Sequence, residues 1–142
     1  MSATPDQDET NMAVRLGFQP GQVVQEIGYA EDVDQQLREA IEQATGTELV
    51  DEDYDDIADA VLLWFREDDG DLTDILVDAI AYTEEGGSIL LLTPKSGRDG
   101  YVEPSEIGEA STTAGLSATR SINAGKEWNG ARLLAPKAAK KR

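Results

Sequence analysis

The acidic side chains are the residues of this chain whose number and spacing could support chemistry. The 142 residues include 29 Asp and Glu against 12 Lys and Arg, with neither His nor Cys. Without an imidazole or a thiol, Ser-His-Asp and Cys-His catalysis cannot be built. Zinc prefers Cys and His ligands, so a structural zinc site is disfavoured, and disulfides are excluded. The chemistry left to consider is cation binding or acid–base catalysis by carboxylates.

Two dense acidic runs, DEDYDD at 51–56 and EDDGD at 67–71, invite a calcium interpretation. On a twelve-residue calcium loop that begins at Asp51, however, Asp56 stands where a glycine makes the bend. Leu62 stands where a bidentate Glu closes the site, and the second run also lacks Gly and Glu at the required offsets. Acid–base catalysis needs a desolvated carboxylate, whereas both runs are hydrophilic. We therefore expect solvated acidic loops, with no metal site and no catalytic residue.

The charge is distributed unevenly along the chain. Residues 31–78 hold 18 acidic and 2 basic residues, a net charge of −16, whereas 120–142 hold 7 basic residues and 1 acid, a net of +6. An acidic surface repels phosphate backbones, so we expect no nucleic-acid binding except through the basic tail. The same surface attracts basic proteins. The charge pattern therefore favours a protein partner.

The length and the terminal composition predict one soluble domain. No apolar run reaches the roughly 18 residues that a transmembrane helix needs. The first residues lack the basic and apolar segments of a secretory signal. We predict a cytoplasmic protein without membrane contact: a disordered acidic leader over 1–12, a single α/β domain over 13–136 and a disordered basic tail over 137–142.

Apolar patterns predict alternating strands and helices. The continuous apolar runs at 58–65 and 88–93 are typical of central strands covered on both faces. Further strands are expected over 22–27 and, more briefly, 48–50, and an antiparallel hairpin over 118–122 and 127–135. The predicted helices run over 33–44 with Asp32 as N-cap, over 72–83 before Gly86-Gly87, and over 104–114.

This order of elements predicts a three-layer α/β fold with a mostly parallel sheet and an antiparallel C-terminal hairpin. Ligands of such sheets bind at the carboxyl ends of the strands. Gly28 and Tyr29, which follow the first strand, and Asp51, after the second, are the weak candidates for cofactor binding. The candidates for contact with a partner lie in the acidic runs, in the loop after 88–93 and on the last strand: Asp53, Asp55, Asp56, Asp68, Asp69, Lys95, Trp128 and Arg132.

The two tryptophans have different expected roles. Trp64 ends an apolar strand and is expected in the core. Trp128 is either half-exposed at an interface or packed under the last helix. Arg132 lies four residues further on, on the same face of a strand, so we expect a stacked Trp128–Arg132 pair.

The motifs resemble two known groups of proteins. The second half is similar to the Rossmann-like fold of class I methyltransferases, on the strand 59–63, the Gly86-Gly87 turn, the strand 88–92 and Ala114-Gly115-Leu116. The whole chain from about 16 to 137 resembles a family of short bacterial proteins of unknown function, and its acidic first half and basic tail resemble the actinobacterial branch. The matching residues are Leu16, Gly17, Pro20, Gly21, Pro94, Lys95, Trp128 and Arg132.

The methyltransferase resemblance implies a truncated Rossmann fold and, in its complete form, a glycine-rich cofactor loop after the first strand. This chain has one glycine there, Gly28, beside Tyr29, and the middle of the fold is shortened. We therefore expect no cofactor, and we favour a non-catalytic regulatory or adaptor protein that binds a protein partner through its acidic surface. The alternative is a ligand-binding protein or enzyme that retains a pocket for S-adenosylmethionine or a nucleotide, so enzymatic activity stays open. Exposed edge strands also allow a homodimer.

Overall fold

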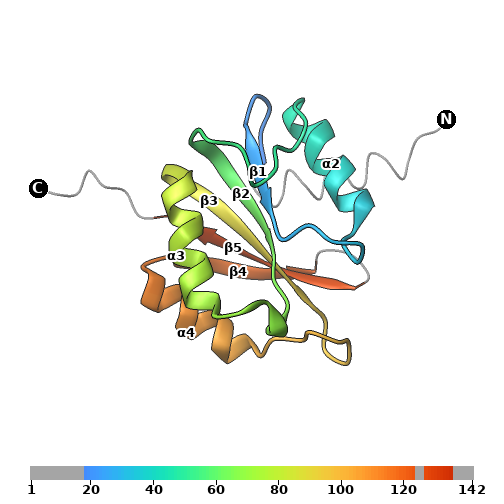
Figure 1. Ribbon diagram of the computed structural model, residues 1–142, viewed down its shortest axis with the longest axis vertical. Helices are drawn as coiled ribbons and strands as arrows, with labels where there is room; N and C mark the ends of the chain where they lie inside the picture. Colours follow the sequence, from blue (N-terminus) through green and yellow to red (C-terminus); the bar gives the residue numbers. More distant parts are fainter. Residues whose placement is uncertain (1–17, 124–126, 136–142) are drawn as a thin grey trace, which may run out of the picture.

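The computed structural model describes residues 18–123 and 127–135, which form one open sheet with helices on both faces (Figure 1). The strand order is β1-β2-β3-β5-β4. β1, β2 and β3 are parallel neighbours, whereas β5 runs antiparallel between β3 and β4. The predicted mostly parallel sheet and the antiparallel C-terminal hairpin are therefore confirmed. The strands are β1 (Val24–Ile27), β2 (Ala58–Trp64), β3 (Thr83–Pro94), β4 (Ser117–Asn123) and β5 (Trp128–Leu134).

In the described part of the chain, three helices complete a three-layer arrangement, as predicted. α2 covers one face of the sheet, and α3 and α4 cover the other (Figure 1). The apolar run of β2 serves both layers: alternate residues such as Leu62 pack towards α2, and those between them, such as Leu63, pack towards α3. The helices are α2 (Gln35–Thr45), α3 (Leu72–Tyr82) and α4 (Pro104–Ala114), and a 3-10 turn spans Glu67–Asp69.

The start of α2 differs from the prediction. Asp34, not Asp32, is the N-cap, and its carboxylate accepts a hydrogen bond from the Leu37 amide at 3.1 Å. Asp32 is engaged elsewhere, in an ion pair with Arg66. The helix ends at Thr45, and Gly46 caps it in a left-handed conformation with φ 79°.

Gly86 and Gly87, predicted to form a turn between a helix and a strand, have a different role. α3 ends at Tyr82, and β3 begins at once and includes both Gly86 and Gly87. A Cβ on Gly87 would lie 2.6 Å from the carbonyl oxygen of Asp59, so the glycine permits close approach of β3 to β2. The predicted strand over 48–50 is reduced to a single parallel bridge between Val50 and Gln25.

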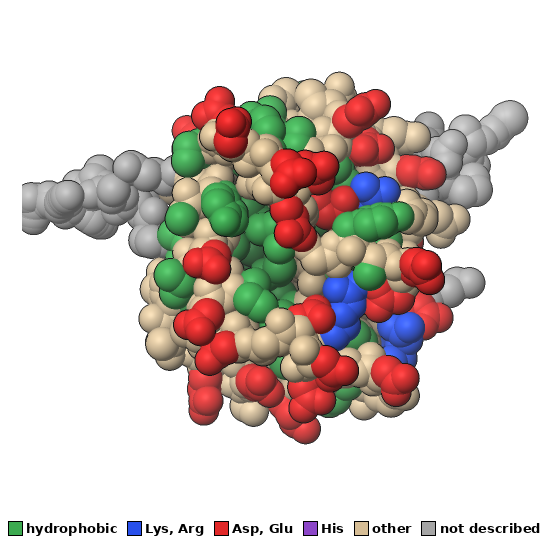
Figure 2. Space-filling view, in the orientation of Figure 1, with side chains coloured by type: hydrophobic (Ala, Val, Ile, Leu, Met, Phe, Trp, Pro, Cys, Tyr) green, Lys and Arg blue, Asp and Glu red, His purple; other side chains and the backbone are tan. Residues whose placement is uncertain are grey.

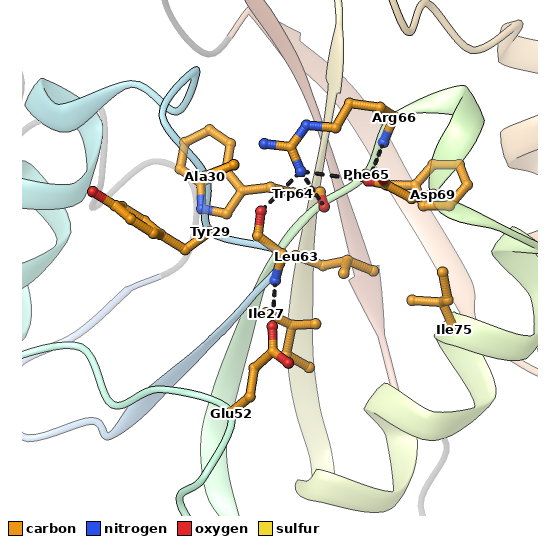
Figure 3. A pocket seen from close by; sticks show the side chains of 11 residues that line it. Ile27, Tyr29, Ala30, Glu52, Leu63, Trp64, Phe65, Arg66, Asp69 and Ile75 are labelled. Atoms are coloured by element: carbon orange, nitrogen blue, oxygen red, sulfur yellow. Dashed lines mark hydrogen bonds and ion pairs between the residues drawn. The ribbon is translucent and has the colours of Figure 1, made fainter.

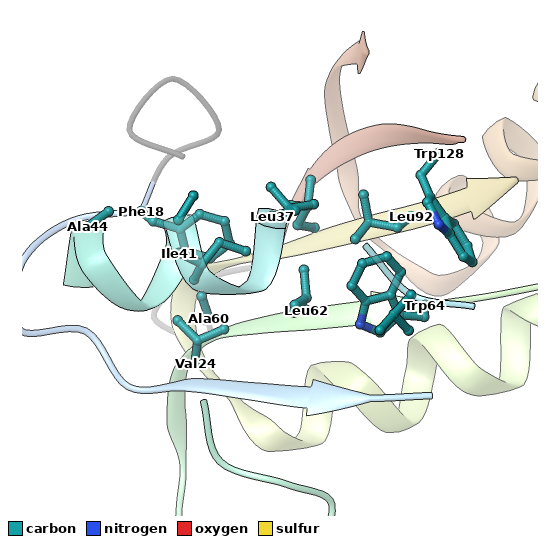
Figure 4. Close-up of a cluster of buried hydrophobic side chains, with 13 residues drawn as sticks. Phe18, Val24, Leu37, Ile41, Ala44, Ala60, Leu62, Trp64, Leu92 and Trp128 are labelled. Carbon is teal, nitrogen blue, oxygen red and sulfur yellow. The ribbon is translucent and has the colours of Figure 1, made fainter. Parts of the chain in front are cut away.

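Both tryptophans are buried on the α2 side of the sheet (Figure 4). Each is 1% exposed, and their rings meet edge to face with centroids 4.8 Å apart. Trp64 is in the core as predicted. For Trp128, both the half-exposed position and the position under the last helix are wrong, because its cluster is that of α2.

The predicted Trp128–Arg132 stack is also wrong. The guanidinium groups placed over the Trp128 ring come from Arg66, at 5.3 Å, and Arg98, at 6.0 Å. Both belong to loops at the carboxyl ends of strands, where Trp128 itself pairs with Pro94. Arg132 is paired with Leu90, four residues along β5, a separation of about 13 Å in a strand.

Several predictions concern residues beyond those described. The leader over 1–12 and the tail over 137–142 lie outside them, as does most of an apolar segment that ends at the buried Phe18. Among the described residues, no helix has the length and apolar character to cross a membrane. The division into leader, domain and tail stays a prediction.

The cap of α2 can be tested by substitution. Asp34→Ala should lower the free energy of unfolding by about 1 kcal/mol, because the Leu37 amide loses its acceptor. Glu39→Ala, at an exposed position inside the same helix, should change it by less than about 0.5 kcal/mol. Urea unfolding followed by circular dichroism measures both, and an equal effect of the two substitutions would contradict the assigned cap.

Candidate functional site

Between β1 and β2, the chain changes the direction in which it adds strands to the sheet. From β1 it passes through α2 to Val50, which bridges to the outer side of β1, and then returns to β2 on the inner side. Open α/β sheets bind ligands at the carboxyl ends of strands at such a switch point. A cavity of about 340 Å³ lies here (Figure 3). We call it the switch-point cavity; its lining includes Ile27, Gly28, Glu52, Leu63, Arg66, Asp69 and Ile75.

Gly28 is required by the protein's own backbone. Its φ is +85°, and a Cβ added to it would lie 2.2 Å from the carbonyl oxygen of Trp64. The residue thus allows the end of β1 to approach the end of β2. Tyr29 does not fill the cavity: its side chain is 53% exposed, and its ring lies 4.7 Å from the Arg38 guanidinium.

Arg66 connects the two strand ends above the cavity. Its Nη1 donates to the carbonyl oxygen of Gly28 at 2.8 Å, and its Nε donates to Asp32 at 3.1 Å. Nη2 forms an ion pair with the second carboxylate oxygen of Asp32. Asp69 lies 3.4 Å from Nη1 (Figure 3). The side chain is only 14% exposed. The guanidinium therefore fixes the loop after β1 to the loop after β2.

The charges of this bridge reinforce one another. Burial of Arg66 disfavours its charged form, but the hydrogen bonds and charges of Asp32 and Asp69 outweigh burial and raise its pKa above the ordinary value. Hydrogen bonding by Arg66 lowers the pKa of Asp32 below its usual range, against a smaller opposing effect of burial. The bridge is therefore charged throughout the neutral range.

The acidic loop over 51–56 is held across β1, in its first part, by a buried amide. Gln25 is 1% exposed, and its Nε2 donates to the carbonyl oxygens of Asp51, at 3.1 Å, and Tyr54, at 3.3 Å. Glu52 then reaches the loop after β1, where its Oε2 accepts from the Gly28 amide at 2.9 Å. The carboxylate of Asp51 accepts from the Asp53 amide instead. Glu52, and not the predicted Asp51, is thus the acid at the switch point.

A second network ties α2 to the sheet. Glu26 is 5% exposed, and its two oxygens accept from Arg38 at 2.7 and 2.8 Å. Its Oε2 also accepts from the indole of Trp64 at 2.8 Å. These bonds satisfy the buried carboxylate, so Glu26 has a structural role beside a hollow of about 420 Å³ that Arg38, Tyr29 and the acidic loop also line.

The sequence did not single out Arg66, Glu52 or Glu26. One signal in the sequence could have indicated Arg66: it and Arg38 are the 2 bases among 18 acids over 31–78. In the structure, each of the two is bound by a carboxylate. A lone base in an acidic segment has many available partners and is readily fixed between elements. Which of the neighbouring acids would bind it could not be read from the sequence.

The predicted partner-contact residues fall into separate groups. Asp53, Asp55 and Asp56 are exposed before β2, at its amino end, whereas Asp68 and Asp69 follow β2 at its carboxyl end. The remaining three are apart from both: Lys95 is half-buried after β3, Trp128 is buried, and Arg132 is half-buried on β5. Within the described ranges, no three carboxylates are grouped so as to hold a metal ion.

The close approach of Gly28 to the Trp64 carbonyl predicts that two glycine substitutions differ in their effect on stability. Gly21→Ala should cost about 1–2 kcal/mol, because φ is +88° there but nothing lies within 4 Å of the new Cβ. Gly28→Ala has the same conformational cost and must also displace the Trp64 carbonyl, so it should cost at least about 2 kcal/mol more. Urea unfolding compares the two variants, and equal losses would contradict the close approach.

The lowered pKa of Asp32 predicts a pH-dependent contribution to stability. Because the folded pKa lies below the ordinary value of 3.8, the carboxylate stabilises the fold above that pH. Its contribution is lost as the pH falls through the folded value. Asp32→Asn should therefore be less stable than the parent at pH 7, and the difference should shrink below about pH 3.8.

Urea unfolding from pH 7 to pH 2.5 measures this difference. The exposed Asp53→Asn is the matched control and should not lower stability at any of these pH values. A gap between the parent and Asp32→Asn that stays constant down to the lowest pH would contradict the ion pair with Arg66.

Solved structures with a similar fold include proteins described as methyltransferases. The pyocyanin biosynthetic protein PhzM matches 89% of this chain with a TM-score of 0.67 and 13% identity, and the chain spans about half of that protein, 54%. A methyltransferase from Pyrococcus furiosus matches 94% of this chain and 83% of its own length, with a TM-score of 0.56 and 14% identity. A SAM-dependent methyltransferase from Aquifex aeolicus matches 94% and 93%, with a TM-score of 0.55 and 14% identity. The fold is therefore a Rossmann-like methyltransferase fold, as the resemblance implied.

Sequence relatives come from mycobacteria. An uncharacterised protein of Mycobacterium tuberculosis (strain H37Rv) is 52% identical over 128 residues, which cover 90% of this chain and 80% of the relative. An uncharacterised protein of Mycobacterium bovis matches to the same extent, 52% over 128 residues. These relatives confirm the expected actinobacterial character. Since the family model described as "Protein of unknown function (DUF3052)" matches residues 13–137, the chain belongs to that family.

Proposed function

We propose that this protein is a non-catalytic regulatory or adaptor protein that binds a protein partner through its acidic surface. The observation that carries the proposal is the hydrogen bonding of the Gly28 backbone. Its amide donates to Glu52 and its carbonyl accepts from Arg66, so the protein itself uses both backbone polar groups of this glycine, in the loop where a Rossmann fold binds its ligand.

The residues at this loop do not fit an adenosyl cofactor. In the Rossmann pattern, glycines let a ligand approach the backbone and leave its amides free to bind. Here the single glycine accommodates the Trp64 carbonyl, and the space above it is crossed by the Arg66–Asp32 ion pair. A ligand in that position would have to break charge-assisted hydrogen bonds of a largely buried guanidinium, which are among the stronger ones in proteins.

The acidic loop has the features of a binding surface. Gln25 and Glu52 hold its first part against β1, while Asp53, Asp55 and Asp56 are exposed. A fixed set of like charges attracts a basic surface over a distance and increases the rate of encounter, with a strong dependence on salt. This supports a basic protein partner for a chain whose net charge is −17.

Three further parts of the proposal rest on the same reasoning. We place the protein in the cytoplasm, on its composition, and we propose no nucleic-acid contact except through the basic residues of 137–142. A homodimer through the sheet edge is compatible with this function, because β4 is the last strand of the described sheet and offers unpaired backbone groups.

The alternative function is a pocket for S-adenosylmethionine or a nucleotide, and the switch-point cavity of about 340 Å³ is the observation in its favour. A thermal-shift titration with S-adenosylmethionine, S-adenosylhomocysteine and ATP separates the two. Binding at a ligand concentration of about 100 Kd would add about 2.7 kcal/mol of stability. We expect no concentration-dependent rise in Tm, and a saturable rise with any of the three would overturn the proposal in favour of the alternative.

Partner binding is tested by neutralising matched sets of acids. The variant Asp53→Asn, Asp55→Asn, Asp56→Asn removes three charges from the acidic loop, and Glu103→Gln, Glu106→Gln, Glu109→Gln removes three exposed charges from around α4. Immobilised protein should retain specific partners from a cell extract at low salt and release them at high salt. The first variant should lose them and the second keep them. Equal retention by both variants would contradict binding through the acidic loop.

A further inference from the structure

A hollow with an apolar floor lies between the acidic loop and α3 (Figure 2). α3 and α4 cover this face of the sheet over β2 and β3. The end of β1, between the acidic loop and α3, is not covered by either helix. Ile27 and Leu63 form the floor, and Ile75 projects from α3 on one side (Figure 3). Ile27 and Ile75 are only partly buried. The switch-point cavity is therefore an apolar opening on the protein surface.

Carboxylates border this opening on both sides. Glu52 lines it from the acidic loop. On the α3 side, the exposed Asp74 and Asp78 precede and follow Ile75, with Asp78 one helical turn further along. Figure 2 shows acidic side chains around the apolar hollow. The charge of Arg66 at the upper end is matched by Asp32 and Asp69, so the border remains acidic overall.

The combination of an apolar floor and an acidic border defines the chemistry of a complementary ligand. The apolar part must enter the cavity, and positive groups must lie on either side of it. A volume of about 340 Å³ is near the lower end of the roughly 300–1,000 Å³ of ligand pockets, so it suits one or two side chains rather than a whole helix. The chain's own basic tail is a poor match, since its apolar residues over 136–142 are Pro and Ala alone.

We propose that the switch-point cavity binds a short basic segment of a partner protein, in which one aromatic or branched apolar side chain enters the cavity between flanking Lys or Arg residues. These cations contact Glu52 on one side and Asp74 and Asp78 on the other. This inference rests on the proposed function: it names the kind of segment that the acidic surface recognises and the place where its apolar residue binds.

The probe for this site is a fluorescein-labelled peptide, acetyl-KKSWSKK-amide, and its matched partner acetyl-KKSASKK-amide, which lacks the apolar anchor. Fluorescence anisotropy at low salt should show that the tryptophan peptide binds the full chain at least about tenfold more tightly than the alanine peptide, a difference of about 1.4 kcal/mol. An acidic peptide, acetyl-EESWSEE-amide, should not bind.

Two protein variants locate the binding. Ile75→Ser removes the apolar side wall and should abolish the preference for the tryptophan peptide, whereas Val77→Ser, at a 49% exposed position of the same helix, should preserve it. Glu52→Gln keeps an acceptor for the Gly28 amide but removes a charge, so it should weaken both basic peptides. Circular dichroism checks that each variant is folded. If Ile75→Ser does not fold, Glu52→Gln still tests whether the peptides bind at this site.

The outcomes separate this inference from the proposed function. Equal binding of the tryptophan and alanine peptides would overturn the cavity as the anchor site while leaving the acidic surface as a binding site. An equal loss of preference in Ile75→Ser and Val77→Ser, or no binding of the tryptophan peptide, would overturn the inference as well. A parent chain that is dimeric in light scattering and becomes monomeric in Ile75→Ser would show that a second copy occupies the cavity, which also contradicts it.

Discussion

The guanidinium of Arg66 is the contact on which the switch point of this fold depends. It reaches from the end of β2 to the carbonyl of Gly28 and to Asp32, and thereby connects the loops after β1 and β2. Trp128 packs beneath it from the start of β5 and donates from its Nε1 to the Asp32 carbonyl at 3.2 Å. Residues far apart in the sequence thus converge where related folds leave room for a ligand. The polar groups of the switch point are thus bound by the protein's own side chains.

The acidic loop is held beside this bridge by a few polar contacts. Gln25 binds the loop backbone from below, and Glu52 closes it onto Gly28. A loop held in this way loses less conformational freedom on binding than a free one, which favours affinity for a partner. The apolar floor of the switch-point cavity is continuous with this loop, so charge and shape act on the same face. In the function that we propose, a methyltransferase-like fold uses this face to bind a partner.

The sequence predicts the layers of this fold better than its contacts. The apolar runs of β2 and β3 reveal central strands, because burial on both faces leaves a continuous hydrophobic signal. The N-cap of α2 was misassigned to Asp32 because its ion pair with a residue 34 positions away is a tertiary contact. In the same way, nothing in a run of adjacent acids distinguishes Glu52, which reaches Gly28, from Asp51. Local patterns encode local structure, whereas the site depends on which distant side chains meet.

The most direct test of the closed switch point is an NMR titration of the ¹⁵N-labelled protein with S-adenosylmethionine. The amide of Gly28, bound by Glu52, and the Nε–H of Arg66, bound by Asp32, report on the two contacts that close the loop. Our account predicts that both protons exchange slowly with solvent and that neither resonance moves during the titration. Rapid exchange of both, with saturable shifts at Gly28 and Arg66, would show an open cofactor site and contradict the account.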